Sequence, residues 1–323
     1  MRLAFEDREY ELASGESVLE CLERHQAGVP SYCRNGVCQT CLMRAEEGMV
    51  PAAAQQGLKE TWKARGWFLS CMCRPAGDMR VARCDGAGEY KAQVLEVRSL
   101  SARVLRVRLT RPAGFDYAAG QFIQLVRPAD GLMRPYSLAS TPDEPFLELH
   151  VAQLPEGRLS GWLAEAEGQQ VSLKGPYGEC FYVQEPAPRP LLLVGTGTGL
   201  APLYGVLRTA IAAGHGAAMR LIHGAADAQG LYLWSAMRAL AGAHRHLECT
   251  GSVQAGAAAQ DIRVEPLQTL VQQCGIPLAE ARVYICGNPD FVRGLRKQLY
   301  LAGTPLSRIH ADPFLPPADA PHS

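Results

Sequence analysis

Three cysteines that lie close together near the N-terminus constrain the fold more than any other feature of the sequence. Cys33, Cys38 and Cys41 follow the spacing C-x4-C-x2-C, and Cys71 comes 30 residues after Cys41. The N-terminal residues are acidic where an export signal would be apolar, so we expect a cytoplasmic protein with reduced thiols. The 11 cysteines are an odd number, which also disfavours a full set of disulfides. Metal ligation is therefore the better interpretation of this group.

The spacing is the one with which plant-type ferredoxins bind a 2Fe–2S cluster. Asn35 and Gly36 are turn-forming residues, and a tight loop brings backbone N–H groups close to the sulfur atoms, where they stabilise a negative cluster. A zinc site is the main alternative, but zinc sites usually combine two short cysteine pairs, and one is present here. Buried structural cysteines are a second alternative, although three in one short loop would be unusually dense.

The N-terminal segment resembles the plant-type ferredoxin domain, which implies a β-grasp fold. In that family the fourth ligand stands in a Leu-x-Cys context, which residues 69–71 match, so the resemblance favours Cys71 over Cys73. The sequence departs from the family at Tyr32, before the first cysteine, and at Gln39, after the second. Both departures bear on the potential or exposure of the cluster, and neither removes a ligand.

The sequence changes character twice, which predicts three domains and a tail. Residues 1–85 form the cysteine-rich domain, followed by a short linker. Alternating apolar runs separated by glycine and proline predict a small antiparallel β-barrel over residues 89–186. Over residues 189–315, apolar strands alternate with helices, as in a parallel α/β domain. Residues 316–323 have the composition of a disordered tail.

The predicted barrel contains the motif Arg134-Pro135-Tyr136-Ser137, which resembles the R-x-Y-S signature of ferredoxin–NADP reductase-like flavoproteins. The resemblance implies a six-stranded barrel that binds FAD. It assigns Arg134 to the pyrophosphate, Tyr136 to stacking on the flavin, and Ser137 to the ring nitrogen that receives hydride. By itself the motif also fits a strand with an exposed tyrosine.

Two later segments follow in the order expected for that family. In the first, a helix that begins near Ser160, after Gly157, would direct backbone N–H groups at a phosphate. The second is the segment G-P-Y-G from Gly175, which matches a turn that closes the family's barrel. The resemblance therefore implies that Gly157, Ser160 and Gly175 contribute to cofactor binding.

A glycine-rich loop after a buried strand indicates a nucleotide site in the third domain. Residues 191–202 read as strand, loop and helix, and the glycines allow the backbone to approach a pyrophosphate. The segment resembles the G-T-G-x-G-x-A-P motif of the same reductase superfamily. That resemblance implies four cofactor-binding residues: Gly195, Thr196, Gly197 and Gly199.

Two further matches lie near the C-terminus. Cys286 begins a C-G-x-P segment, and the resemblance places it beside the nicotinamide as a catalytic and cofactor-binding residue, together with the catalytic Ser137. Cys286 also fits a small core residue at the end of a strand. Asp312-Pro313-Phe314 falls where relatives carry an acidic residue and an aromatic, and the loose match implies that Phe314 covers the flavin.

We expect NADH as the electron donor, with NADPH as the alternative. Residues 223–230, after the second strand of the third domain, contain no arginine that would bind a 2′-phosphate. Asp227 fits an acceptor for a ribose hydroxyl group, or simply a solvated turn residue.

The order of the three domains predicts a path for electrons from NADH through FAD to the 2Fe–2S cluster. A hydride carries two electrons and the cluster accepts one, so a flavin is needed to link them. The chain, apart from its tail, resembles ferredoxin reductases of bacterial oxygenase systems, of the benzoate and naphthalene dioxygenase type, which implies a terminal oxygenase or a similar acceptor protein as partner. Three alternatives stay open: a reductase of deoxysugar biosynthesis with a pyridoxamine-dependent dehydratase as partner, an iron–sulfur redox sensor, and a flavin reductase with a vestigial cluster.

The charge balance argues against other classes of function. Lys and Arg number 32, as do Asp and Glu, so the formal net charge is zero, whereas nucleic-acid-binding proteins carry a basic excess. The longest uncharged run, residues 190–207, contains four glycines, which favours a strand and a turn over membrane insertion. Residues 1–85 carry 11 basic and 12 acidic residues, a net charge of 11 − 12 = −1, so we expect partner docking through shape and apolar contacts.

Overall fold

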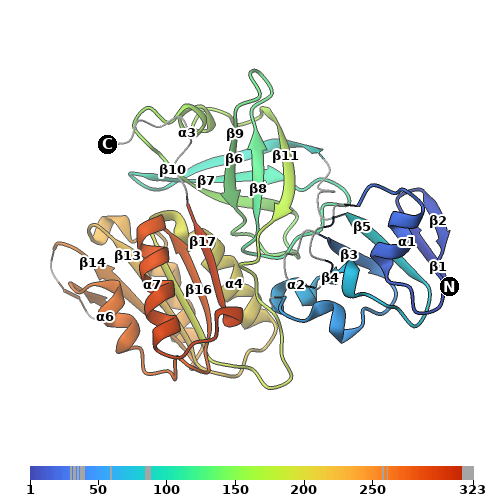
Figure 1. The fold of residues 1–323 in the computed structure, drawn as a ribbon. Helices are drawn as coiled ribbons and strands as arrows, with labels where there is room; N and C mark the ends of the chain where they lie inside the picture. The colour runs from blue at the N-terminus through green and yellow to red at the C-terminus, as the bar shows by residue number, and fades with distance from the viewer. Residues whose placement is uncertain are drawn as a thin grey trace. The chain divides into compact units, whose positions relative to one another are not determined.

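The computed structural model describes residues 1–29, 31, 34, 36, 41–58, 60–83, 89–256, 258–259 and 261–314. The chain forms two compact units, an N-terminal unit of residues 1–87 and a C-terminal unit of residues 88–323 (Figure 1). The C-terminal unit contains two six-stranded sheets. The predicted linker after Cys84 and the predicted tail from residue 316 lie outside the described residues.

A five-stranded mixed sheet forms the N-terminal unit, with the strand order β2-β1-β5-β3-β4. The strands are β1 (Arg2–Phe5), β2 (Arg8–Glu11), β3 (Leu42–Glu47), β4 (Trp67–Leu69) and β5 (Met79–Arg83). Strand β1 pairs parallel with β5, and the other pairings are antiparallel. The sheet is ferredoxin-like, as the predicted β-grasp domain requires.

Helix α1 (Val18–Arg24) begins with a capping box that the sequence specifies. The Glu20 N–H donates to Ser17 Oγ at 3.2 Å, and the Ser17 N–H donates to Glu20 Oε2 at 2.7 Å. Val18, Leu19 and Leu22 are buried, as their helical spacing predicts. Three shorter elements complete this unit: α2 (Glu60–Ala64) and the 3-10 helices η1 (Ala52–Gln55) and η2 (Ser70–Met72).

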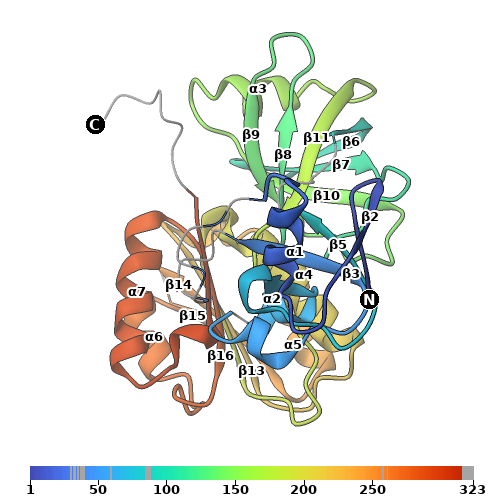
Figure 2. The ribbon, with the colours of Figure 1, turned by 45° about the vertical axis from the view of Figure 1, so that its right-hand side comes forward.

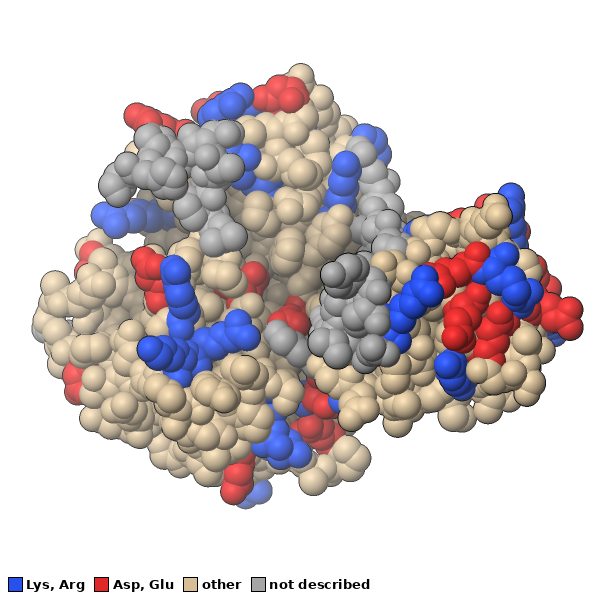
Figure 3. All heavy atoms as spheres, in the orientation of Figure 1, with Lys and Arg blue, Asp and Glu red and all other residues tan. Residues whose placement is uncertain are grey.

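The surface of the N-terminal unit carries compensated charges. Figure 3 shows acidic and basic side chains next to one another on it. Three glutamates on and before α1 each pair with an arginine: Glu16 with Arg24 at 2.8 Å, Glu20 with Arg74 at 3.2 Å, and Glu23 with Arg34 at 3.0 Å.

The first sheet of the C-terminal unit is a closed antiparallel barrel with the strand order β10-β7-β6-β11-β8-β9. A bridge between Leu138 and Leu149 joins its two ends. The strands are β6 (Glu89–Ser101), β7 (Val104–Thr110), β8 (Phe122–Val126), β9 (Met133–Ser137), β10 (Phe146–Ala152) and β11 (Gln170–Tyr177). The antiparallel barrel predicted from the alternating apolar runs is therefore confirmed, as are the six strands that the family resemblance implies.

The second sheet is parallel, with the strand order β15-β14-β13-β12-β16-β17. Its strands are β12 (Leu191–Thr196), β13 (Met219–Ala225), β14 (Leu247–Val253), β15 (Ile262–Arg263), β16 (Arg282–Gly287) and β17 (Ile309–Pro313). Its helices are α4 (Leu200–Ala212), α5 (Trp234–Ala243), α6 (Leu267–Gln272) and α7 (Pro289–Leu301). The 3-10 helices are η3 (Gly197–Gly199), η4 (Ala228–Gly230) and η5 (Leu306–Arg308).

Helices cover both faces of this sheet, and β12 lies between two apolar cores. Leu191 and Leu193 belong to the core under α4 and α5, whereas Leu192 and Val194 belong to the core under α6 and α7 (Figures 1 and 2). Burial on both faces explains the wholly apolar run in the sequence and confirms the predicted parallel α/β domain. Over the described ranges, no helix has both the length and the apolar character needed to cross a membrane.

Candidate functional site

The antiparallel pairing of β3 and β4 brings together two of the four predicted cluster ligands. Leu42 pairs with Leu69, so Cys41, just before β3, and Cys71, just after β4, lie at the same end of the strand pair. The N–H and the hydroxyl of Ser70 both donate to the Cys41 carbonyl oxygen, at 3.1 and 2.8 Å. Both cysteines are buried in one small apolar cluster. The strand pairing thus closes the long sequence gap between the third and fourth predicted ligands.

Cys73 lies in a different environment from Cys71. Its side chain is fully buried in the main core of the N-terminal unit, with Phe5 and Phe68. Its Sγ lies 3.9 Å from Met79 Sδ. This position supports Cys71 rather than Cys73 as the fourth ligand.

Part of the predicted ligand loop can be followed, and it is anchored to α1. Glu23 Oε1 accepts hydrogen bonds from Ser31 Oγ at 2.8 Å and from Arg34 at 3.0 Å. Gly36 has a φ of +75°, and a Cβ atom there would lie 3.0 Å from the Met72 side chain, so the loop approaches the turn after β4 closely. Five residues of this loop that are discussed above lie outside the described residues: Tyr32, Cys33, Asn35, Cys38 and Gln39.

The described residues fit a cluster as far as they reach. They contain no group of three or more possible metal ligands, because two of the four predicted cysteines are not among them. The two that are described are buried thiol-bearing residues joined by Ser70, and Gly36 brings the loop close to the turn after β4. Cys41 and Cys71 would bind the cluster at the end of the β3–β4 strand pair.

Strand β9 carries the predicted flavin motif at the end of the barrel sheet. Arg134 and Tyr136 alternate with the exposed Met133 and Pro135, so they lie on the same face of the strand. Among the described residues, the Arg134 side chain donates only to the neighbouring Met133 carbonyl oxygen, at 2.8 Å. Tyr136 packs on the barrel core, and burial raises the pKa of its phenol. The arginine therefore keeps donors for an anion, and the tyrosine is a neutral ring.

Helix α3 (Arg158–Leu163) begins two residues before the predicted start at Ser160. The reason is Gly157, which occupies the N-cap position. A Cβ atom at Gly157 would lie 2.2 Å from Ser160 Oγ, so a larger residue there would require the Ser160 side chain to move. Ser160 Oγ instead donates back to the Gly157 carbonyl oxygen at 3.3 Å.

Gly175 lies at an irregularity in the pairing of β11 with β8. Its φ is +139°, a conformation that favours glycine, and a Cβ atom would lie 3.3 Å from the Phe122 carbonyl oxygen. Together with Arg134, Tyr136 and the first turn of α3, the barrel fits a flavin dinucleotide: it offers a cation and backbone N–H groups for phosphate and an aromatic ring for stacking. When bound, FAD accepts a hydride and releases electrons singly.

The glycine loop after β12 lies directly against the end of β16. A Cβ atom at Gly199 would lie 2.3 Å from the Cys286 carbonyl oxygen. A Cβ atom at Gly195 would lie 2.7 Å from the Leu203 side chain and 3.1 Å from the Gly199 carbonyl oxygen. Gly199 therefore allows the loop to approach the predicted catalytic cysteine, and Gly195 allows β12 to pack closely on the loop and on α4.

Two polar contacts fix the shape of this loop. Gly197 has a φ of +53°, and its carbonyl oxygen lies 3.0 Å from Nε2 of the buried His223. Burial lowers the pKa of His223 to about 4, so the ring is neutral and its Nε2–H donates to Gly197. Thr196 Oγ1 accepts from the backbone N–H of Asn288 at 2.9 Å.

Ser137, Cys286 and Asp312 meet where the barrel and the parallel sheet join. Burial raises the pKa of Asp312 to about 6, and the nearby Ser137 hydroxyl opposes this shift. Asp312 pairs in register with Cys286 across β17 and β16. Cys180 Sγ lies 3.7 Å from Cys286 Sγ, and burial together with this contact raises the pKa of Cys286, which is therefore a neutral thiol.

The structure thus places Asp312 near both predicted catalytic residues, Ser137 and Cys286, and Cys180 beside Cys286. Asp312 was noted in the sequence only as an acidic residue, and Cys180 carries no local motif. The predicted Phe314 follows β17, and its N–H donates to the Gly287 carbonyl oxygen at 2.8 Å. Its backbone is therefore held next to Cys286, and its role over the flavin stays a prediction.

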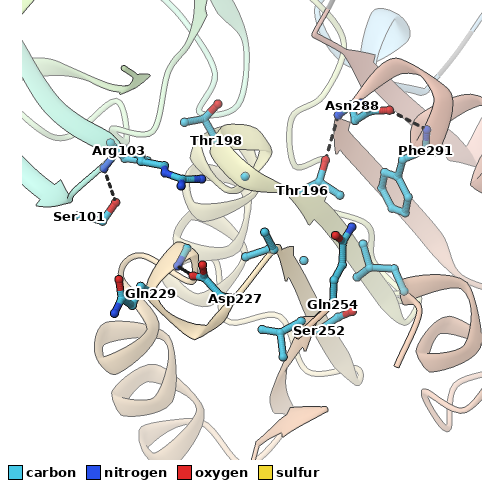
Figure 4. Close-up of a pocket in the computed structure, with 18 of the residues that line it drawn as sticks. Ser101, Arg103, Thr196, Thr198, Asp227, Gln229, Ser252, Gln254, Asn288 and Phe291 are labelled. Carbon is cyan, nitrogen blue, oxygen red and sulfur yellow. Dashed lines mark hydrogen bonds between the residues drawn. The ribbon is translucent and has the colours of Figure 1, made fainter. Parts of the chain in front are cut away.

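A cavity of about 930 Å³ opens beside the glycine loop (Figure 4). Its lining includes the predicted Thr196 and Gly197 and, on the other side, the end of β13 at Asp227. The volume is in the range of cofactor sites. Two lining residues had no signal in the sequence: Arg103, from the barrel, and Phe291, from α7.

Comparison with known families follows the same three parts of the chain. Residues 3–76 match the 2Fe-2S iron-sulfur cluster binding domain, residues 91–182 the oxidoreductase FAD-binding domain, and residues 193–297 the oxidoreductase NAD-binding domain. The reductase subunit of an aromatic O-demethylase from Amycolatopsis is 36% identical over 241 residues, which are 70% of this chain and 72% of that protein. The chain belongs to the family of iron–sulfur flavoprotein reductase components. The resemblance predicted from the sequence motifs is therefore confirmed.

Similarity to this family extends over nearly the whole chain. The reductase component of the naphthalene 1,2-dioxygenase system of Pseudomonas putida is 28% identical over 94% of this chain and 95% of its own length. The crystal structure of an Amycolatopsis cytochrome P450 reductase covers 98% of this chain and 99% of its own, with 29% identity and a TM-score of 0.66. The present chain is therefore a reductase that transfers electrons from a nicotinamide dinucleotide through FAD to a 2Fe–2S cluster.

Proposed function

We propose that this reductase takes electrons from NADH and supplies them to an oxygenase, and that hydride transfer occurs at Ser137, Asp312 and Cys286. The observation that carries the site assignment is the position of Asp312, which pairs in register with Cys286 on the parallel sheet and lies close enough to Ser137 on the barrel for the hydroxyl to affect its pKa. It joins the predicted flavin strand to the predicted nicotinamide site.

The relatives support an oxygen-activating acceptor. One serves a naphthalene dioxygenase system and one is a cytochrome P450 reductase, and both cover the length of this chain. They favour an oxygenase over the dehydratase partner of deoxysugar biosynthesis. We propose the domain limits 1–85, 89–186 and 189–315 for the cluster, flavin and nicotinamide parts of this path.

The chemistry of the site follows from the single proton of the Ser137 hydroxyl. With Asp312 ionised, the hydroxyl donates to the carboxylate. With Asp312 protonated, the carboxyl group donates to Ser137 Oγ, and the hydroxyl proton is available to the flavin ring nitrogen. Cys286 remains a neutral thiol and adds no charge beside the nicotinamide. The role of the site is therefore positioning and hydrogen bonding, without a covalent step.

The donor preference rests on Asp227, which follows β13. Its Oδ1 accepts from the Gly230 N–H at 2.9 Å, so the carboxylate is fixed at the cavity. A carboxylate at this place accepts from a ribose 2′-hydroxyl and repels a 2′-phosphate. We therefore propose NADH as the preferred donor.

An anaerobic titration tests the path of the electrons. Purified protein is titrated with NADH and then with NADPH, and flavin absorbance and the electron paramagnetic resonance signal of the reduced cluster are recorded. We expect flavin bleaching followed by the cluster signal with NADH. Flavin reduction without a cluster signal in the wild type would contradict the proposal.

A pair of cysteine variants separates the cluster from the flavin. Cys71→Ser should abolish the cluster signal and lower cytochrome c reduction at least about tenfold, while ferricyanide reduction by the flavin is retained. Cys274→Ser, a matched change at a partly exposed cysteine of the parallel domain, should leave both activities intact. If Cys71→Ser still reduces cytochrome c, the cluster is vestigial.

The number of turnovers separates a reductase from a sensor. A wild-type protein that stops after one reduction per molecule is a sensor rather than a supplier of electrons.

A further inference from the structure

The cavity beside the glycine loop has a charge distribution that the sequence motifs do not explain. Three of its lining residues are charged: Arg103, Asp227 and Glu265. Arg103 is therefore the one cation among the described residues that line it. Every nicotinamide dinucleotide carries an anionic pyrophosphate, and the two acidic residues do not favour its binding.

The barrel presents Arg103 on a rigid turn. Residues 102–103 form the two-residue turn between β6 and β7. The Arg103 N–H donates to Ser101 Oγ at 3.3 Å, and its carbonyl oxygen accepts from the Gln153 N–H at 2.8 Å. The backbone of Arg103 is thus held on both sides, to its own strand pair and to the end of β10.

The Arg103 side chain is directed at the cavity rather than at a neighbour. Figure 4 shows the guanidinium group pointing into the cavity, between Thr198 of the glycine loop and Asp227. In the part of the chain that the structure describes, this guanidinium has no hydrogen bond or ion pair. A cation held in this way, without an internal partner, is suited to an anionic ligand.

We propose that Arg103 is a substrate-binding residue that the flavin barrel contributes to the nicotinamide site, where its guanidinium binds the pyrophosphate of NADH. The proposal rests on the NADH oxidation proposed above. The guanidinium fork matches two phosphate oxygens, and the glycine loop opposite supplies backbone N–H groups. Asp227 occupies the ribose end of the cavity and disfavours the 2′-phosphate as the alternative partner.

The position of Arg103 has a consequence for catalysis. Because it belongs to the barrel and not to the parallel sheet, binding of the dinucleotide connects the two domains that must align for hydride transfer. Loss of Arg103 should therefore weaken binding of NADH much more than it lowers the rate of hydride transfer from NADH once it is bound.

The test compares Arg103→Ala, Arg103→Lys and the control Arg98→Ala in the purified holoprotein. Arg98 is exposed on β6 and does not line the cavity, so its removal changes the net charge equally. Dissociation constants for ADP-ribose and for adenosine are measured by titration. KM and kcat for NADH and for NADPH are measured in steady-state assays with ferricyanide as the electron acceptor. ADP-ribose contains the pyrophosphate and lacks both the nicotinamide and the 2′-phosphate.

We expect Arg103→Ala to raise the Kd for ADP-ribose and the KM for NADH about 10- to 100-fold, as loss of a charge-assisted hydrogen bond implies. Adenosine affinity and kcat should change less than about twofold, and Arg103→Lys should recover part of the loss. An effect no larger than that of Arg98→Ala would overturn the proposal, as would a loss confined to NADPH. ADP-ribose binding needs no turnover, so this result stands apart from any failure of the wild type to oxidise NADH.

Discussion

The carboxyl group of Asp312 links the rate of hydride transfer to pH. Burial raises its pKa to about 6, against the smaller opposing effect of the nearby Ser137 hydroxyl. Because the folded pKa lies above the ordinary value of 3.8, the protonated form predominates below pH 6 and the carboxylate above it. The Ser137 hydroxyl is available to the flavin in the protonated form, so we expect the rate of flavin reduction to fall about 3- to 10-fold as pH rises from 5 to 7.5. Stopped-flow mixing with saturating NADH measures this rate.

The variant Asp312→Asn provides the control for this pH dependence. Asparagine does not titrate, and its amide group donates to Ser137 Oγ at every pH. The variant should therefore show a flat profile over the same range, with a rate at pH 7.5 no lower than that of the wild type. A step near pH 6 that persists in Asp312→Asn would assign the titration to another group.

The residues around Asp312 also show what a sequence motif leaves out. Ser137 and Cys286 each stand in a short motif that can be recognised alone. Cys180 is 106 residues from Cys286, and the contact between their sulfur atoms depends on how the segment after β11 approaches β16 in the fold. Arg103 is likewise an ordinary turn residue until the barrel places it at the cavity. Such residues are determined by tertiary structure, and no local signal predicts them.

At the scale of elements, the glycine loop after β12 depends on close contact with β16. Gly199→Ala would place a Cβ atom 2.3 Å from the Cys286 carbonyl oxygen, a distance that forces the loop away from β16. We expect kcat/KM for NADH to fall at least about tenfold, because the displaced loop no longer holds the dinucleotide in the correct position relative to Cys286. Steady-state kinetics with ferricyanide measures this change.

A glycine elsewhere in the same domain gives the matched control. Gly294 lies in α7, and a Cβ atom there meets no atom within 4 Å. Gly294→Ala should leave kcat/KM intact and stabilise the helix by about 0.5–1 kcal/mol, seen as a higher Tm. Equal kinetics in Gly199→Ala and Gly294→Ala would show that the close approach at Gly199 has no functional consequence.

Elements with a clear apolar pattern could be predicted, and the others could not. Strand β12 is apolar at four consecutive residues because helices cover both of its faces, and α1 begins at a serine with a glutamate three residues later. Strand β14 was not predicted, because Glu248 and Thr250 alternate with its buried residues and interrupt any apolar run. Strand β17 contains Asp312, a polar residue whose place in the sheet comes from pairing with β16.

At the scale of the whole molecule, the near-zero charge of the N-terminal unit predicts how its cluster reaches a partner. The glutamates on and before α1 are paired with arginines, and Figure 3 shows acidic and basic side chains next to one another on this unit, so the described surface gives no strong field of one sign. Steering by charge requires such a field and is screened by salt. We therefore expect cluster-dependent reduction of cytochrome c, a basic acceptor, to change less than about threefold between 20 and 200 mM NaCl.

The salt experiment needs a control for the earlier steps. Flavin reduction by NADH, followed by stopped flow in the same buffers, shows whether salt acts on donor binding rather than on the acceptor. If flavin reduction is constant while cytochrome c reduction falls more than about tenfold, an acidic docking face must be present despite the pairing of the α1 glutamates. If both rates are nearly constant, the acceptor is recognised by shape and apolar contact, because these interactions depend little on ionic strength.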